Sequence, residues 1–337
     1  MNNRKSILIS GVQPTGKLHL GNYLGALKNF VELQNSGKYQ CYFFIADLHS
    51  LTEDFNPKQK PAQIKDLIAD YLAAGIKPKK SVIFAQSAIP AHSELTWILD
   101  TITPLGELRR MTQFKEKSES APQNINVGLF TYPTLMAADI LLYDAAVVPV
   151  GEDQLQHLEL TRTLARKFNS KFPARAGGGK TFIEPKPLLT KAERLMSLDI
   201  PTKKMSKSRP AGCLFLDDSP TVIKVKIMRA TTDSGKEIKY NEKNKPGISN
   251  LLLIYSALSN KSVKTIEKIY EGKGYAEFKK DLAEAVVKAL APFQKKKKEL
   301  VKKPSPIKRV LAAGNKKADA VASKKILEVK KKIGLII

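Results

Sequence analysis

The sequence predicts an α/β protein with a doubly wound parallel sheet, followed by a second, smaller all-helical domain. Short apolar runs of strand length alternate with helix-length segments in the first half of the chain, which is typical of a parallel sheet covered by helices. Residues 173–213 are rich in Pro, Gly and Lys and have weak periodicity, as expected of long loops around a site. Beyond Ser219 the apolar residues recur at helical spacing, which predicts helices alone.

The first predicted unit is a strand, a turn and a helix. Residues 6–12 form the strand, and the helix that follows buries the apolar side chains of Tyr23, Leu24, Leu27, Phe30 and Val31. Two further strands are expected at 41–46 and 82–85. A helix lies between them in the sequence, and its apolar face carries Ile64, Leu67, Ile68, Tyr71 and Leu72. The spacing of these residues is that of one helix face.

The alternation then repeats once more. We expect a helix from about Pro133 to Tyr143, a strand at 147–150 and a helix from about Asp153 to Phe168. The helical pattern of the second domain is clearest at Phe278, Leu282, Val286 and Leu290. These elements predict a Rossmann-like first domain.

We predict three domain units. Residues 1–213 form the Rossmann-like domain and 214–310 the helical domain, and 311–337 form a C-terminal helix that packs back on the first. The lysine run 295–298 precedes two prolines, and we expect it to be a solvated linker between helices.

Composition restricts the class of protein. The chain has 337 residues and 42% apolar content, enough for a large core and a smaller one. It has no apolar run of 18 residues, so no membrane span is predicted.

The apolar run 7–9 is too short for a secretion signal, which predicts a cytoplasmic protein. Cys41 and Cys213 form no C-x-x-C pair, so we predict free thiols and no protein-bound metal.

Charge indicates a polyanionic partner. The chain carries 57 basic and 32 acidic side chains, a net charge of +25, which favours nucleic-acid binding. Residues 294–337 alone have a net charge of +12. A general lysine bias in the source organism is the alternative explanation.

Three segments are candidates for phosphate binding. Residues 11–18 resemble a Walker A loop, but Leu18 has no hydroxyl for Mg²⁺. Residues 174–181 fit a looser form of the same pattern, but Pro185 and Pro187 prevent the helix that would receive the phosphate. The third segment is His19-Leu20-Gly21-Asn22, at the first turn of a predicted helix, where free N–H groups attract anions. A histidine that only caps its own helix is the alternative.

A second motif favours the interpretation of the third segment as a phosphate site. Lys204-Met205-Ser206-Lys207-Ser208 and the His19–Asn22 tetrapeptide together resemble the two signatures of class I aminoacyl-tRNA synthetases. Asn22 stands where the second histidine of the family signature would be, as it does in the tryptophan enzymes. The resemblance extends over nearly the whole chain and is closest to the bacterial-type tryptophanyl-tRNA synthetases. Its further segments are 11–16, 106–117, 131–139, 151–154 and 245–250.

The resemblance implies a function and a set of site residues. The activity would be ATP-dependent activation of L-tryptophan followed by transfer to tRNA(Trp). His19, Asn22, Lys204 and Lys207 would be the catalytic residues, because transition-state charge on phosphorus and pyrophosphate must be stabilised. ATP, as its Mg²⁺ complex, would bind the following residues: Gln13, Pro14, Thr15, Gly21, Asn22, Gly151, Glu152, Asp153, Leu195, Lys204, Met205, Ser206, Lys207 and Ser208.

The implied tryptophan site is Tyr132, Met136, Asp139, Gln154 and His49, with Asp47 as a further candidate. Tyrosine enzymes usually have glutamine where this chain has Met136, so a tyrosine enzyme is the nearest alternative. A thioether suits the face of an indole, and Asp139 would accept its N–H. A binding protein without catalysis is the other alternative.

The resemblance also implies partners. Residues 214–310 would bind the tRNA anticodon, and the enzyme would be a homodimer. Arg209, where relatives often carry aspartate, and the insertion 177–180 have no implied role.

Overall fold

The computed structural model describes residues 5–115, 125–173, 179–189 and 195–336. It contains a five-stranded, wholly parallel sheet with the order β3-β2-β1-β4-β5. The strands are β1 (Ile7–Val12), β2 (Gln40–Ile45), β3 (Ser81–Ala85), β4 (Val147–Val150) and β5 (Lys186–Leu189). This order confirms the predicted doubly wound α/β class.

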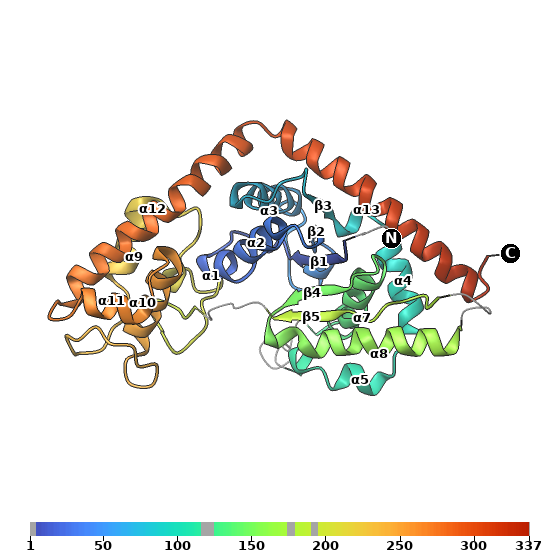
Figure 1. Ribbon diagram of the computed structural model, residues 1–337, viewed down its shortest axis with the longest axis horizontal. Coiled ribbons are helices and arrows are strands. Elements are labelled where there is room, and N and C mark those ends of the chain that lie inside the picture. The colour runs from blue at the N-terminus through green and yellow to red at the C-terminus, as the bar shows by residue number, and fades with distance from the viewer. Residues whose placement is uncertain (1–4, 116–124, 174–178, 190–194, 337) are drawn as a thin grey trace.

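Helices and short helical turns connect the strands on both faces of the sheet (Figure 1). The segments between β1 and β3 are α1 (Leu20–Asn22), the π-helical turn η1 (Tyr23–Leu27), α2 (Lys28–Ser36), η2 (His49–Thr52) and α3 (Lys60–Ala74). Those between β3 and β5 are η3 (Gln86–Ala88), α4 (Ala91–Asp100), α5 (Leu105–Arg109), α7 (Val127–Leu141), η5 (Glu152–Gln154) and α8 (Leu155–Lys171).

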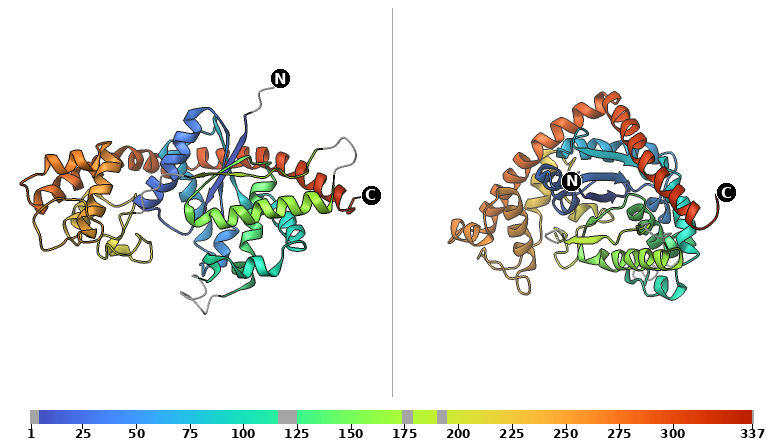
Figure 2. Two further views of the ribbon diagram at one scale, coloured as in Figure 1. Left: turned by 60° about the horizontal axis from the view of Figure 1, so that its bottom comes forward. Right: turned by 45° about the vertical axis from the view of Figure 1, so that its right-hand side comes forward.

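The second part of the chain is helical, as predicted. Its elements are η6 (Pro210–Gly212), α9 (Pro220–Met228), α10 (Pro246–Ser259), α11 (Val263–Ile269), α12 (Tyr275–Lys302) and α13 (Ser305–Lys332). Figures 1 and 2 show α12 and α13 as a bent strap that runs from the helical region over the sheet. Within the described residues, none of these helices combines the length and the apolarity that crossing a bilayer requires.

Alternate residues of β1, β2 and β3 contribute to two cores, one on each face of the sheet. Leu8 and Phe43 belong to the core under α2 and α3, which continues into the helical region. Ile9 and Phe44 belong to the other core, under α4, α7 and α8. Strands buried on both faces are expected in a doubly wound sheet.

Helix α13 covers the open edge of the sheet at β3. A Cβ atom at Gly314 would lie 1.7 Å from the carbonyl oxygen of Ile83, so only glycine allows the helix to come this close. The next residue, Asn315, accepts a hydrogen bond from the backbone N–H of Ala85 at 3.0 Å. An edge strand that would otherwise expose unpaired backbone groups is thereby closed.

The structure corrects three sequence predictions. Helix α7 begins at Val127, where Asn126 caps it by accepting from Leu129 N at 2.8 Å, and Pro133 lies inside the helix rather than at its start. Strand β5 was not predicted, because residues 173–213 are rich in Pro, Gly and Lys and were expected to form loops. Proline alone does not exclude a strand here, since β4 contains Pro149 and was predicted. Pro187 lies in an edge strand, where proline is tolerated.

The third correction concerns the lysine run 295–298. These residues lie within α12 and do not form a linker. Lys295, Lys296 and Lys298 are exposed, as expected of a solvated cluster, but Lys297 is buried. The connection between α12 and α13 consists only of Lys303 and Pro304, and the predicted unit boundary at 310 therefore falls inside α13.

Candidate active site

A cavity of about 320 Å³ opens between the carboxyl ends of β1 and β4. The strand order reverses at this point, because β1 pairs with β2 on one side and with β4 on the other. Ligands of doubly wound sheets bind where the order reverses. Gly11 and Gln13 line the cavity from the β1 side, and Gly151 lines it from the β4 side.

All five side chains implied for tryptophan binding line this one cavity: Tyr132, Met136, Asp139, Gln154 and His49. Three come from α7, where residues 132, 136 and 139 lie on one helix face. Phe44 and Val150 add apolar surface. The cavity thus combines an apolar wall with a few polar groups, as small-molecule sites do.

Asp47 does not line the cavity. Its carboxylate turns to η3, where it accepts hydrogen bonds from the backbone N–H of Ser87 at 2.8 Å and from the Ser87 hydroxyl. The expectation that Asp47 forms part of the pocket wall was therefore wrong. The residue instead holds the end of β2 to the end of β3.

Asp139 is the most constrained carboxylate of the cavity. Its Oδ1 accepts from Gln86 Nε2 at 2.7 Å and lies 2.6 Å from His92 Nδ1, while Oδ2 lies 2.8 Å from His49 Nε2. Burial alone would raise its pKa, but the two imidazoles outweigh burial and hold the pKa of Asp139 below its ordinary value. The carboxylate is therefore ionised at neutral pH and fixed in direction.

Gln86 and His92 were missed from the sequence. His92 also bonds the Tyr143 hydroxyl at 2.9 Å, so a chain of polar groups lies behind Asp139. A signal was present for Gln86, which directly follows β3 and so lies at the same sheet edge as the other site residues. The chain has only four histidines, and all of them are buried at or near this site: His19, His49, His92 and His157. Their small number would have made each one a candidate for the site.

Gln113 links the two sides of the cavity mouth. Its Oε1 accepts from the Tyr132 hydroxyl at 3.1 Å, and its Nε2 donates to Asp153 Oδ2 at 3.1 Å. Gln154 Nε2 donates to the same Asp153 oxygen at 2.9 Å. A Cβ atom at Gly151 would lie 2.6 Å from the Asp153 carboxylate, so glycine keeps that side chain in place. Glu152 lies beside it, exposed, in η5.

The His19–Asn22 tetrapeptide forms a reciprocal cap at the start of α1. His19 Nδ1 accepts the backbone N–H of Asn22 at 3.3 Å, and Asn22 Oδ1 accepts the backbone N–H of His19 at 3.1 Å. Burial, and then the charges of Lys207 and Lys204, lower the pKa of His19 to about 4. A neutral ring that accepts at Nδ1 carries its proton at Nε2. Capping and phosphate binding are therefore compatible, because His19 Nε2–H and Asn22 Nδ2 remain as donors.

Gly21 belongs to this turn for a steric reason. A Cβ atom there would lie 3.0 Å from the His19 ring. Leu195 is the next neighbour at 3.9 Å, and its own side chain is buried in the core. A substitution at position 21 would therefore displace the capping imidazole.

The loop 204–208 lies against the turn that follows β1. Lys207 Nζ donates to Thr15 Oγ1 at 3.3 Å and to the Gly16 carbonyl at 3.2 Å, and burial lowers the pKa of Lys207. Met205 anchors the loop, since its side chain is buried and its N–H bonds the Leu195 carbonyl at 3.0 Å. The turn after β1 and the loop 204–208 are far apart in the sequence, and together they form one polar side of the candidate phosphate site.

The remaining predicted nucleotide residues lie in the same two segments. Pro14 is buried in the turn after β1, and Lys204 is exposed on the loop. The hydroxyls of Ser206 and Ser208 lie 2.9 Å apart. Arg209 donates to the Lys204 carbonyl at 3.0 Å, so this departure from the family pattern braces the loop.

The rejected phosphate loops have no such geometry. Leu18 is buried in the core. Residues 174–178, including part of the 177–180 insertion, lie outside the described residues, as do 116 and 117 at the end of the 106–117 segment. Beyond the insertion the chain forms β5 and not a helix, as Pro185 and Pro187 predicted.

Comparisons with known proteins agree with one another. The family model described as tRNA synthetases class I (W and Y) matches residues 1–291. The chain is 48% identical to the tryptophan–tRNA ligase of Bacillus anthracis and 49% identical to that of Caldanaerobacter subterraneus subsp. tengcongensis, over 98% of each protein. The crystal structure of tryptophanyl-tRNA synthetase from Mycoplasma pneumoniae has a TM-score of 0.86 at 38% identity and covers 98% of both chains.

A further solved structure contains ligands. Tryptophanyl-tRNA synthetase from Campylobacter jejuni, complexed with ADP and tryptophan, has a TM-score of 0.82 at 34% identity. The match covers 97% of this chain and 99% of the other.

Proposed function

The chain belongs to the class I tRNA synthetases for tryptophan and tyrosine, and we infer that it joins L-tryptophan to its tRNA at the expense of ATP. The observation that carries this function is the cavity at the strand-order reversal, which has both an apolar wall with polar groups for an amino acid and a neighbouring cluster of phosphate donors. The first reaction forms tryptophanyl-adenylate, and the second transfers tryptophan to tRNA(Trp).

Adenylate formation needs alignment and charge stabilisation, and no general base. A carboxylate oxygen of tryptophan bonds to the α-phosphorus of ATP, and the bond from that phosphorus to the bridging oxygen breaks as pyrophosphate leaves. We propose that His19, Asn22, Lys204 and Lys207 stabilise the charge that develops on phosphorus and on the leaving group. ATP enters as its Mg²⁺ complex, and Mg²⁺ leaves with pyrophosphate.

The other nucleotide contacts follow from the same arrangement. We propose that Gln13, Pro14 and Thr15 border the phosphates, that Gly21 allows adenosine close to the backbone, and that Asp153 bonds the ribose hydroxyls. The remaining proposed contacts are Gly151 and Glu152 after β4, Leu195, and Met205, Ser206 and Ser208 on the loop 204–208.

Tryptophan selection is assigned to α7. We propose that the indole N–H donates to Oδ2 of Asp139, which has one described partner whereas Oδ1 has two. Met136 covers the indole face, Tyr132 and Gln154 bind the α-amino group, and His49 keeps Asp139 oriented. A site built for one N–H rejects analogues that lack it, because its acceptor would then be buried without a partner.

The test is amino-acid-dependent exchange of labelled pyrophosphate into ATP, with all twenty amino acids. We expect exchange with tryptophan and at least about 10⁴-fold less with tyrosine or phenylalanine. Exchange with tyrosine at a comparable rate would refute the assignment to Asp139 and Met136. Without exchange for any amino acid, the chain would be a binding protein.

We propose that residues 214–310, the helical region, contact the tRNA anticodon. Residues 1–213 contain the active site, and residues 311–337 pack on that domain and stabilise it. A cavity of about 550 Å³ beside α11 supports the anticodon contact, since its lining has a positive excess of five lysines over three glutamates: Lys236, Lys239, Lys264, Lys268 and Lys273 against Glu237, Glu267 and Glu271. Replacing Lys264 and Lys268 by alanine should reduce tRNA charging and its salt dependence. Pyrophosphate exchange should not change. An equal loss in both assays would argue against the assignment of tRNA binding to 214–310 and of adenylate formation to 1–213.

We also propose that the protein is a homodimer. Trp97 and Val127 are 73% and 77% exposed, and Leu51 and Ile125 are about half exposed, which is unusual for large apolar side chains on a monomer. A hollow of about 320 Å³ lies among Leu51, Trp97 and Leu135, and it shares Tyr132 with the tryptophan cavity. Light scattering should give the mass of a dimer, and Trp97→Glu should give a monomer.

We assign the reaction to the cytoplasm. Both described cysteines, Cys41 and Cys213, are buried free thiols, as is usual in a reducing compartment. Localisation of the tagged protein by microscopy tests this assignment.

A further inference from the structure

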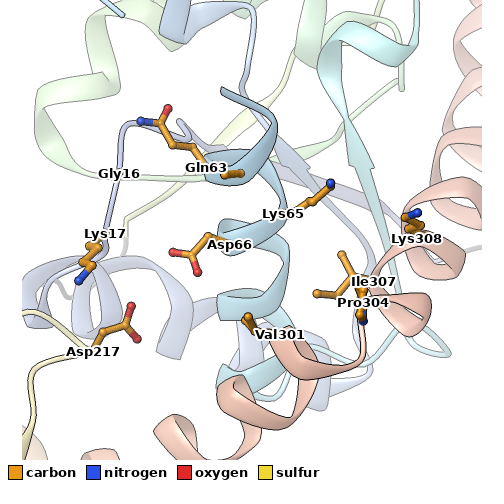
Figure 3. A pocket seen from close by; sticks show the side chains of 11 residues that line it. Gly16, Lys17, Gln63, Lys65, Asp66, Asp217, Val301, Pro304, Ile307 and Lys308 are labelled. Atoms are coloured by element: carbon orange, nitrogen blue, oxygen red, sulfur yellow. The ribbon is translucent and has the colours of Figure 1, made fainter. Parts of the chain in front are cut away.

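A second hollow, here called the corner hollow, lies where the bend between α12 and α13 faces α3 and the turn after β1. Its volume is about 460 Å³, which is in the range of small-molecule sites. Figure 3 shows Val301, Pro304 and Ile307 on the side of the bend. The corner hollow and the tryptophan cavity share no lining residue. It is therefore a separate candidate site.

The bend gives the corner hollow an apolar floor. Ile307 is buried, whereas Val301 in the same hollow is 55% exposed. Pro304 and, from α3, Ala62 extend this apolar surface. A concave apolar surface between two parts of a fold is a common place for the apolar body of a small ligand.

The rim of the corner hollow has a positive excess. Three exposed lysines line it: Lys17, Lys65 and Lys308. In the described part of the chain, their ammonium groups have no hydrogen bond or ion pair. The two carboxylates of the rim, those of Asp66 and Asp217, are already paired with the ammonium of Lys297 at 3.0 and 2.8 Å. The unpaired charges of the rim are therefore cationic and favour an anionic ligand.

A direct contact connects the corner hollow to the loop 204–208. Gly16 lines the hollow, and its carbonyl oxygen accepts a hydrogen bond from Lys207 Nζ at 3.2 Å. The next residue, Lys17, belongs to the cationic rim. An anion bound to Lys17 thus lies beside the turn that holds Lys207.

We propose that the corner hollow is a regulatory site for a small molecule with an apolar body and one acidic group, and that its occupant weakens ATP binding. The apolar body lies on Val301 and Ile307, and the acidic group is bound by the lysines of the rim. The bound anion repels the phosphates of ATP, because like charges at neighbouring sites disfavour each other. The effect on ATP rests on the proposed function of Lys207, whereas the binding of the small molecule does not.

Two fluorescent probes test the ligand class. 8-Anilinonaphthalene-1-sulfonate has an aromatic body and one acidic group, and it reports on apolar surfaces. N-phenyl-1-naphthylamine has the same body without the sulfonate. With the full chain and saturating tryptophan, which blocks the other cavity, we expect the sulfonate to bind at least about tenfold more tightly than the uncharged probe. Equal affinities would contradict the role of the lysine rim.

Four variants locate the bound probe. Val301→Asp places a negative charge on the apolar floor, and Lys308→Glu reverses a charge of the rim. Each should weaken binding of the sulfonate at least about tenfold, and Lys308→Glu should change binding of the uncharged probe less than about twofold. Leu327→Asp and Lys316→Glu are the matched controls, because both residues are exposed on α13 and neither lines the hollow.

The proposal requires that both controls bind the sulfonate as the wild type does. All four side chains are exposed, so these variants should fold, and circular dichroism checks this. If the sulfonate binds equally well to Val301→Asp, Lys308→Glu and the controls, it binds elsewhere and the corner hollow is not its site.

ATP provides the test of regulation. Saturating ATP should weaken sulfonate binding to the wild type about 2- to 5-fold, and the sulfonate should weaken equilibrium ATP binding by the same factor. No change in either affinity would overturn the regulatory role. Complete displacement of the sulfonate by ATP would place it in the nucleotide site and overturn the proposal.

Pyrophosphate exchange by the wild type separates the two levels of inference. If exchange with tryptophan is absent, the proposed function fails, while the fluorescence titrations still measure binding in the corner hollow. If exchange is present but the variants bind the sulfonate as the wild type does, only the regulatory site fails.

Discussion

His19 and Asn22 cap each other: the imidazole accepts the backbone N–H of Asn22, and the Asn22 amide oxygen accepts the backbone N–H of His19. These two bonds use the acceptor atom of each side chain. The donor atom of each, His19 Nε2 and Asn22 Nδ2, is left for a ligand. The same contacts that begin the helix thus orient the two donors that we propose bind phosphate.

Asn22→Asp separates capping from phosphate binding. The aspartate keeps an acceptor for the His19 N–H but has no donor and adds a negative charge. We expect the melting temperature to stay close to that of the wild type and tryptophan-dependent exchange to fall about 10²- to 10³-fold. Exchange kinetics and thermal unfolding measure the two effects. Unchanged exchange would show that Asn22 is only a cap.

The low pKa of His19 makes stability depend on pH. The folded pKa is about 4, below the unfolded value of about 6.5, so the unfolded chain takes up the proton first as pH falls. The contribution of His19 to the free energy of unfolding is complete above about pH 6.5. This contribution, on the order of 3 kcal/mol, is lost as the pH falls from about 6.5 to 4.

Urea unfolding of wild type and His19→Asn measures this contribution. Asparagine also caps helices but does not titrate, so the other histidines cancel in the comparison. The wild type should lose more stability than the variant between pH 7 and 4.5. Parallel curves would mean that His19 titrates normally in the folded protein.

Lys207 is held on the Gly16 turn and should act mainly in the transition state. We expect Lys207→Met to lower the rate of adenylate formation about 10²- to 10³-fold while ATP binding weakens only a few-fold. Single-turnover kinetics and equilibrium ATP binding give the two values. Lys203→Met, an exposed neighbour, is the control. Equal losses in rate and binding would contradict a transition-state role.

The sequence predicts local features of this protein well. β1 and β2 follow from short apolar runs. The two segments proposed to be catalytic are contiguous motifs, and each supports the identification of the other. β5 was missed because its four residues lie in a stretch rich in Pro, Gly and Lys that has weak periodicity. β4 has the same length and also contains a proline, but it follows a clear helical pattern and was predicted.

Features that depend on distant segments were not predictable. Lys297 lies in the same run of lysines as the exposed Lys298, and its ion-pair partners Asp66, Asp70 and Asp217 are far away along the chain. The place of Gln86 directly after β3 was a local signal, but its bond to Asp139 of α7 depends on the fold. Burial of a polar group depends on partners that only the fold supplies.

Met136 should control the choice between tryptophan and tyrosine. We expect Met136→Gln to reduce the preference for tryptophan over tyrosine, as a ratio of kcat/KM values, by about tenfold or more, because an amide fits a phenol hydroxyl better than an indole face. Met136→Leu conserves volume and apolarity and should keep the preference. Exchange kinetics with both amino acids measure the ratios. The same ratio in both variants would remove Met136 from the selection of substrate.

Gly314 connects the last helix to the tryptophan site. Its replacement by alanine would place a Cβ atom against the Ile83 carbonyl and push α13 off β3, so we expect a loss of stability of about 1 to 3 kcal/mol. Ala312→Ser, exposed two residues earlier, should change stability by no more than about 0.5 kcal/mol. Because β3 ends one residue before Gln86, which holds Asp139, the KM for tryptophan should rise in Gly314→Ala while the KM for ATP does not. Urea unfolding and exchange kinetics test both effects, and a Gly314→Ala protein as stable as the wild type would show that α13 can move away from the strand at no cost.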